Sequence, residues 1–194
     1  MTPKILIIGN SGAGKSTAAE MIARHYGTTW TGTSEVIMKT LWEECYPPRH
    51  SDPYKFLSQT QLLRRLRHTD RFGDASRVFL RDAGNIIRKD DPAALAKACL
   101  EYGPIVEGVR THEEYALSNS LFDLVIWIER PGNQPNATDG LRKEDADIVI
   151  VNDSSEEVLE ARLVSALATG RRRMLAARGE SPAQEDTASS GGGI

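Results

Sequence analysis

The chain has 194 residues, of which 40% are hydrophobic and 26% are charged, and its formal net charge is −3. These values suit one globular domain with a buried core, and they exclude a polycation that binds nucleic acid through its whole surface. No apolar run is long enough to cross a bilayer, and no basic-then-apolar leader precedes the first apolar run. The 2 cysteines are too few for a disulfide framework. We therefore expect a cytoplasmic protein with no membrane partner.

A glycine-rich segment, residues 9–16, follows the apolar run 5–8 and precedes the amphipathic stretch 17–26. Its glycines let the backbone turn tightly and direct successive N–H groups at an anion, while the helix that follows points its positive dipole end at the same place. The order strand, loop, helix is that of the phosphate-binding P-loop. We therefore predict that ATP is held by Gly9, Asn10, Ser11, Gly12, Ala13, Gly14, Lys15, Ser16 and Thr17.

Two side chains of this segment carry chemistry of their own. Lys15 would reach the β- and γ-phosphates, and the Ser16 hydroxyl would bind Mg²⁺. The alternative is a simple turn between a buried strand and a helix, with Lys15 in solvent. The complete motif and its two fitting flanks favour the nucleotide site.

Strand patterns alternate with helical periodicity along the chain, which predicts an α/β fold with a five-stranded parallel sheet and helices on both faces. The strands are expected at 5–8, 28–31, 105–106, 124–128 and 147–151. We expect one P-loop domain over residues 1–178, with a helical acceptor-binding insertion at about 33–102, a short lid loop at about 130–145, and a disordered tail at 179–194.

The predicted insertion contains two groups of polar residues with open interpretations. Glu35 follows the second strand at a helix start, where it either serves the helix terminus or contacts the acceptor. Residues 64–89 hold eight basic and three acidic side chains, and Arg77, Arg81 and Arg88 can share one helical face. Such a run is either a solvated helix surface or a set of phosphate contacts.

Further charged residues follow the third and fourth strands. Glu107 and Arg110 stand at the carboxyl end of a parallel strand, where open α/β sheets bind ligands. Glu107 would hold Mg²⁺ through water or accept the acceptor's proton, and Arg110 would bind phosphate; the alternative is an ion pair between the two. The polar loop after the fourth strand contributes Arg130 and Arg142, which would add positive charge over the phosphates.

These residues carry a resemblance to known kinases. Residues 107–110, Glu-Gly-Val-Arg, stand where nucleoside monophosphate kinases have a short acid-to-arginine motif. Residues 128–132 and 145–153 resemble the C-terminal half of tailed-phage deoxynucleoside monophosphate kinases, and the Asp-Ala-Asp strand start is also similar to dephospho-coenzyme A kinases. The resemblance covers residues 4–27 and 103–168 and does not extend to residues 28–102.

This resemblance implies transfer of the ATP γ-phosphoryl group, with Mg²⁺, to a free deoxynucleoside monophosphate. Lys15 and the loop amides would hold the donor phosphates, with Ser16 and Glu107 at the metal. Arg77, Arg81 and Arg110 would bind the acceptor's phosphate. Arg130 and Arg142 would stabilise the moving phosphoryl group, and Asn152 would border the adenine.

Two alternatives remain open, as does the oligomeric state. The core also resembles phage kinases that phosphorylate 5-hydroxymethyluracil in DNA; the basic run 61–68 would then follow a DNA backbone, and Glu35 or Glu107 would deprotonate the hydroxymethyl group. The other alternative is an ATP-hydrolysing switch or assembly factor. A GTPase is less favoured, because the sequence has no Asn/Thr-Lys-x-Asp motif.

Overall fold

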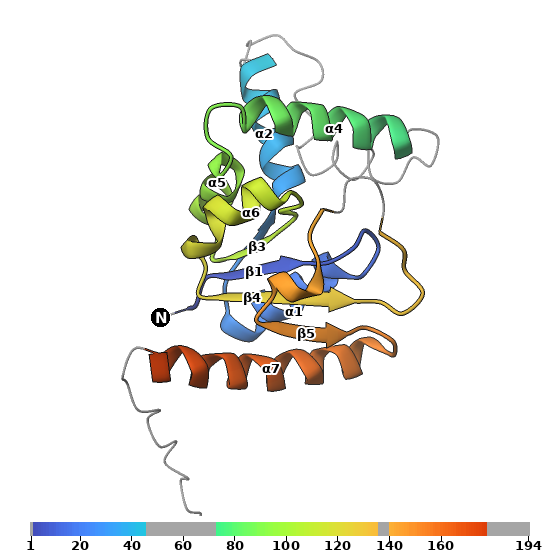
Figure 1. Cartoon of the computed structure of the whole chain (residues 1–194), viewed down its shortest axis with the longest axis vertical. Coiled ribbons are helices and arrows are strands. Elements are labelled where there is room, and N and C mark those ends of the chain that lie inside the picture. Colours follow the sequence, from blue (N-terminus) through green and yellow to red (C-terminus); the bar gives the residue numbers. More distant parts are fainter. Residues whose placement is uncertain (1, 46–72, 136–139, 178–194) are drawn as a thin grey trace, which may run out of the picture.

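The computed structural model describes residues 2–45, 73–135 and 140–177, and the predicted tail and the centre of the predicted lid lie outside these ranges. Five parallel strands form one sheet in the order β2-β3-β1-β4-β5 (Figure 1). The strands are β1 (Ile5–Ile8), β2 (Trp30–Gly32), β3 (Ile105–Glu107), β4 (Leu124–Glu129) and β5 (Ile148–Val151). The prediction of a five-stranded parallel α/β sheet is confirmed.

The central strand β1 is buried on both faces. Ile5 and Ile7 point into one core cluster, and Leu6 and Ile8 point into the other, since successive side chains of a strand alternate between faces. All four are 0% exposed. A continuous apolar run is therefore what this position requires.

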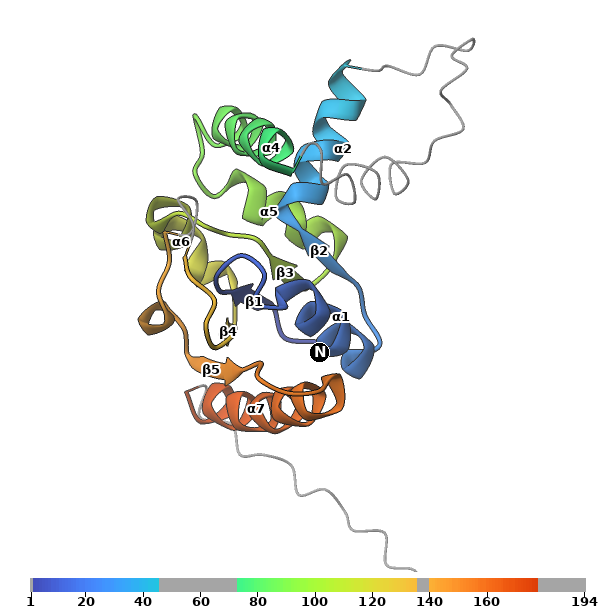
Figure 2. The ribbon, with the colours of Figure 1, turned by 90° about the vertical axis from the view of Figure 1, so that its right-hand side faces the viewer.

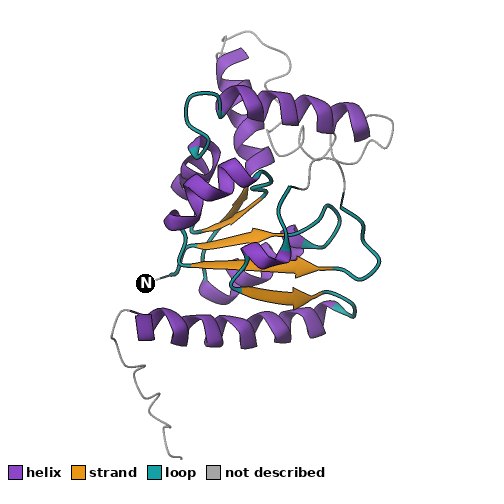
Figure 3. Ribbon diagram, viewed as in Figure 1, coloured by secondary structure: helices purple, strands orange, loops and turns teal. Residues whose placement is uncertain are grey.

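Helices cover both faces of the sheet (Figure 3). The first core cluster is closed by α1 (Lys15–Tyr26) and α7 (Glu156–Ala177). The second is closed by α2 (Thr33–Cys45), α4 (Gly73–Ile87), α5 (Ala94–Tyr102) and α6 (His112–Ser118). Two 3-10 turns, η3 (Asn119–Leu121) and η4 (Lys143–Asp145), complete the connections. Among these described segments, no helix has the length and apolar character needed to span a bilayer.

The connections from β1 and β3 leave the sheet on opposite faces. β1 leads to α1, whereas its neighbour β3 leads to α6, and Figure 2 shows these two helices on opposite sides of the sheet. Diverging connections open a crevice at the carboxyl ends of the two strands, which is where open α/β sheets bind ligands. The fold thus brings residues 9–16 and residues 107–110 to one place.

Two local expectations were wrong in detail. The second strand was expected at residues 28–31 but comprises Trp30–Gly32, because its pairing with β3 sets Gly32 opposite Glu107. The spacing of Ser154 and Glu157 also predicts a capping box before α7. Ser155 takes that place instead, since its carbonyl accepts from the Leu159 N–H and its side chain bonds Glu157, which lowers the pKa of that carboxyl.

Candidate functional site

The glycine-rich loop, residues 9–16, turns through backbone conformations that suit glycine. Gly9, Gly12 and Gly14 have φ angles of +143°, +78° and +96°. A Cβ on Gly9 would lie 2.4 Å from the Ile128 carbonyl oxygen, and one on Gly14 would lie 2.4 Å from Asn152 Nδ2. The loop therefore depends on glycine both for its turns and for its close packing against the ends of β4 and β5.

Two asparagine side chains bind backbone carbonyl groups of this loop. Asn133 Nδ2 donates to the Ser11 carbonyl at 2.6 Å, and Asn152 Nδ2 donates to the Ala13 carbonyl at 2.8 Å. Asn152 was predicted near the adenine, which stays a prediction; its observed contact is with the loop backbone. Asn133 was missed, because a lone asparagine in a polar loop gives no spacing signal.

Lys15 opens α1 and folds back over the loop. Its Nζ donates to the carbonyl oxygens of Gly9 and Asn10, at 2.8 Å each, and the residue is 8% exposed. The ammonium group and the N-terminus of α1 thus place positive charge at the same point. This arrangement attracts an anion to the loop.

Ser16 and Glu107 join the loop to β3. Ser16 Oγ donates to Glu107 Oε1 at 3.0 Å, and Glu107 is 9% exposed. Gly32 on the neighbouring strand leaves room for this carboxylate, since a Cβ there would lie 3.1 Å from Glu107 Oε1. A hydroxyl and a carboxylate are oxygen donors of the kind Mg²⁺ takes, together with water and substrate oxygens. In the described ranges, no group of three or more His, Cys, Asp or Glu side chains is arranged so that it could hold a metal ion.

A cavity of about 400 Å³ adjoins the loop and is bounded by the starts or ends of α2, α4 and α6. Ser11 of the loop forms part of its wall, so the cavity reaches the glycine-rich loop. Its basic lining residues are Arg81, Arg88, Arg110 and His112. A cavity of this size and charge suits a small anionic molecule.

The end of β3 is fastened to the start of α2 beside this cavity. Thr33 Oγ1 donates to the Gly108 carbonyl at 3.0 Å, and Gly108 has a φ of +103°. A Cβ on Gly108 would lie 2.4 Å from that hydroxyl oxygen. This contact fixes the backbone just before Arg110, which lines the cavity.

Arg88 is a cavity residue from the basic run, for which the sequence left open a solvated surface or a phosphate contact. Its Nη1 lies 3.3 Å from Glu114 Oε2, and its Nη2 donates to Asn85 Oδ1 at 3.0 Å. Arg81, which was predicted to bind acceptor, also lines the cavity, but its Nε donates to Asp82 Oδ1 at 3.0 Å and its side chain is 47% exposed. Arg77 belongs to α4, and its side chain lies outside the described residues.

Glu114 is buried beneath this arginine. Burial raises the pKa of its carboxyl, and the nearby positive charge of Arg88 opposes that shift. The N-terminus of α6 is capped separately, because Thr111 Oγ1 accepts from the Glu114 N–H at 3.1 Å. The place of Thr111 at the start of a helical pattern predicts this cap, whereas no sequence pattern predicts the burial of the Glu114 side chain.

The other predicted site residues lie farther out or remain untested in their roles. Thr17 is in the first turn of α1, and Glu35 is half-buried in the first turn of α2. Arg130 follows β4, and Arg142 precedes η4, where its N–H donates to Asp145 Oδ2 at 2.7 Å. Both arginines are exposed, and their proposed action on phosphates remains a prediction.

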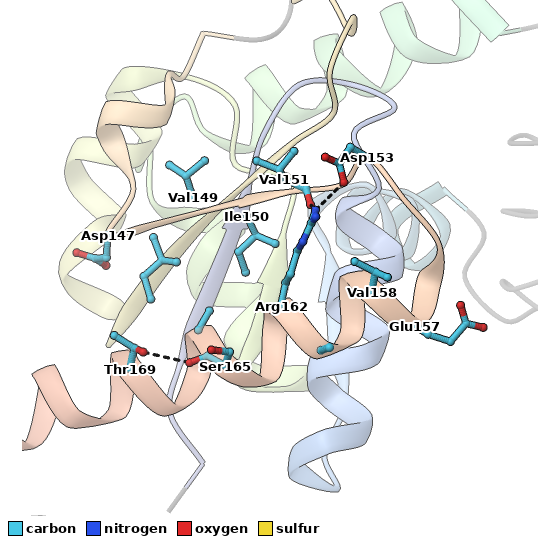
Figure 4. Close-up of a pocket in the computed structure, with 13 residues that line it drawn as sticks. Asp147, Val149, Ile150, Val151, Asp153, Glu157, Val158, Arg162, Ser165 and Thr169 are labelled. Atoms are coloured by element: carbon cyan, nitrogen blue, oxygen red, sulfur yellow. Dashed lines mark hydrogen bonds and ion pairs between the residues drawn. The ribbon is translucent and has the colours of Figure 1, made fainter.

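A second, larger hollow lies between β5 and α7 (Figure 4), with a volume of about 1020 Å³. Its basic lining residue is Arg162, which is paired with Asp153 at 2.7 Å, and its wall also holds the acids Asp147 and Glu157. Acidic groups around one neutralised cation repel phosphate. The smaller cavity beside the glycine-rich loop is therefore the better anion site.

Comparison of the chain with protein-family models and with curated proteins gives no match.

Proposed function

We propose that the protein is a P-loop kinase that transfers the γ-phosphoryl group of ATP to a deoxynucleotide acceptor. The observation that carries this proposal is the contact between two anion-attracting sites. The glycine-rich loop, with Lys15 folded over it, contributes Ser11 to the wall of the cavity that Arg88 and Arg110 line. A phosphoryl donor in the loop would face an acceptor in the cavity.

On the donor side, each residue has a distinct role in this proposal. Lys15 would exchange its bonds to the Gly9 and Asn10 carbonyls for the β- and γ-phosphates. Ser16 and Glu107 would hold Mg²⁺, which when bound neutralises charge on the phosphates. Asn133 and Asn152 would keep the loop carbonyls directed outward, so that the phosphates meet a preformed loop.

On the acceptor side, arginines supply the binding chemistry. Arg110 and Arg88 would bind the acceptor's phosphate, with Arg81 nearer the solvent-exposed rim. Phosphoryl transfer depends chiefly on position and electrostatics, so a phosphate acceptor needs no strong base.

A second acceptor is the hydroxymethyl group of 5-hydroxymethyluracil in DNA. An alcohol needs a base, and the Glu107 carboxylate beside the glycine-rich loop could serve as one. The basic run 61–68, which would follow the DNA backbone in this case, lies outside the described residues.

The deciding experiment supplies γ-labelled ATP and Mg²⁺ together with either free deoxynucleoside monophosphates or a duplex that contains 5-hydroxymethyluracil. We expect label to move to the monophosphates. Label that moves only to the duplex, and less at high salt, would identify the DNA-base kinase instead. Label released only as inorganic phosphate would contradict both kinases and favour the hydrolytic switch.

A further inference from the structure

The side chain of Glu114 is buried, and its surroundings do not satisfy the hydrogen-bonding capacity of its carboxylate. The residue is 1% exposed; its Oε2 lies 3.3 Å from Arg88 Nη1 and 3.5 Å from the Arg110 nitrogen. Its Oε1 has no hydrogen-bond partner within the described ranges. A buried carboxylate with an unsatisfied oxygen lowers stability, and its raised pKa reports the same cost.

The local fold gives no reason for a charge at this position. The N-terminus of α6 is capped by the Thr111 side chain and the Glu114 backbone, which needs no Glu114 carboxylate. A neutral glutamine of nearly the same shape could still accept from the Arg110 N–H. The carboxylate lies against the Arg88 guanidinium, and the charge of Arg88 acts on it more strongly than that of Arg110.

Contacts from α4 and from α6 together direct the Arg88 guanidinium. Arg88 follows the last residue of α4, and its side chain lies back over Gly84, where a Cβ would be 3.3 Å from Nη2. Asn85 Oδ1 accepts from Nη2 on one side, and Glu114 Oε2 lies beside Nη1 on the other. The side chain is 15% exposed, so a long and otherwise flexible arginine is confined at the cavity wall.

We propose that Glu114 is a positioning residue, which holds the Arg88 guanidinium in the orientation that receives an acceptor's phosphate. This inference rests on the proposed function, because it takes the cavity as the acceptor site. A guanidinium that is already oriented loses less side-chain entropy on binding phosphate, and it offers its donors in a fixed geometry. The unfavourable burial of Glu114 is then the cost of a preorganised acceptor site.

The test compares Glu114→Gln with wild type and with the matched control Glu113→Gln, an exposed neighbour on the same helix. Three quantities are measured: the Tm, the Kd for inorganic phosphate in a Lys15→Ala background that removes the glycine-rich loop's contribution, and the KM values for ATP and the acceptor. For E114Q we expect an equal or higher Tm, phosphate affinity about tenfold weaker, and an acceptor KM raised while the ATP KM stays constant.

A double-mutant cycle shows whether Glu114 acts through Arg88. In an Arg88→Gln background, E114Q should cause no further loss of phosphate affinity. A loss of the same size in both backgrounds would overturn the inference. So would a lower Tm with unchanged phosphate affinity, because that pattern marks a purely structural residue, and so would a wild-type cavity that binds no phosphate.

The outcomes for the two proposals can be separated. Phosphate binding requires no turnover, so it tests Glu114 even if wild type transfers no label. A wild-type protein that binds phosphate more tightly than E114Q but phosphorylates no acceptor would contradict the proposed function and support the positioning role.

Discussion

The glycine-rich loop and the cavity beside it are assembled in different ways. The loop is one contiguous segment, and Lys15 bonds backbone carbonyls only six and five residues away. The cavity wall joins distant parts of the chain: Arg88 meets Glu114 across 26 residues, and Thr33 meets Gly108 across 75. A local motif can fix half of a site, while the other half exists only once the sheet and helices have packed.

The largest effect is expected at the loop. Lys15→Ala should lower turnover about 10³-fold or more, because it removes the positive charge nearest the transferred group. The fold should persist, as judged by circular dichroism and Tm.

The matched control for that change is Lys97→Ala. Lys97 lies on α5 in an exposed pair with Asp91, and exposed pairs contribute little to stability. Its turnover should be unchanged. Near-normal turnover in a folded Lys15→Ala protein would show that the loop is not the donor site.

The next effect tests the packing of the loop. Gly9→Ala combines an unfavourable φ with a 2.4 Å approach of its Cβ to the Ile128 carbonyl oxygen. Gly132→Ala also stands at a positive φ, of +80°, but meets no atom within 4 Å. Each change carries backbone strain of about 1–3 kcal/mol, and Gly9→Ala adds both the steric clash and the less accessible φ of +143°. We expect Gly9→Ala to be clearly less stable in urea unfolding, and equal stabilities would show that the loop relaxes freely.

A smaller effect is expected where the polar loop meets the glycine-rich loop. Asn133→Ala removes the hydrogen bond to the Ser11 carbonyl, which at about 1 kcal/mol corresponds to roughly a fivefold increase in the ATP KM. Gln134→Ala, the exposed neighbour, is the control. If both variants have the wild-type KM in steady-state assays, Asn133 does not support the donor site.

The smallest effect concerns pH and the cavity. Burial raises the pKa of Glu114 above the ordinary value of 4.5, so the folded protein holds this proton more tightly than the unfolded chain. Its contribution to stability is fully present below pH 4.5 and is lost as pH rises through the folded pKa. The Tm of E114Q minus that of wild type should therefore grow from acid to neutral pH and then level off. A difference that is constant or shrinks with pH would contradict the buried charge.

Sequence patterns were sufficient for the parallel sheet, for the glycine-rich loop and for the place of Glu107 and Arg110, because each depends on local periodicity or on a strand end. The same patterns were insufficient to predict which side chains contact one another in the site. Asn133 is one polar residue among many in its loop, and nothing in the spacing of Glu114 indicates that it is buried under Arg88. Such pairs follow from how α4 and α6 pack, which no local pattern records.

The basic run also shows that sequence spacing predicts the position of a side chain better than its contacts. Its helical spacing correctly put Arg81 and Arg88 on a common face, and both line the cavity. Spacing could not tell which of the two would be held by partners inside the protein and which would pair with an exposed neighbour.

The most direct test of the central claim is the affinity of one ligand that joins ATP to thymidine through a phosphate bridge, measured by titration calorimetry. If the loop takes the donor and the adjoining cavity takes the acceptor, this ligand should bind at least about 10²-fold more tightly than ATP alone. That gain should be lost in Arg110→Ala, while Lys15→Ala should weaken both ligands. An affinity no greater than that of ATP, or a gain that survives Arg110→Ala, would contradict the claim that the two sites work together.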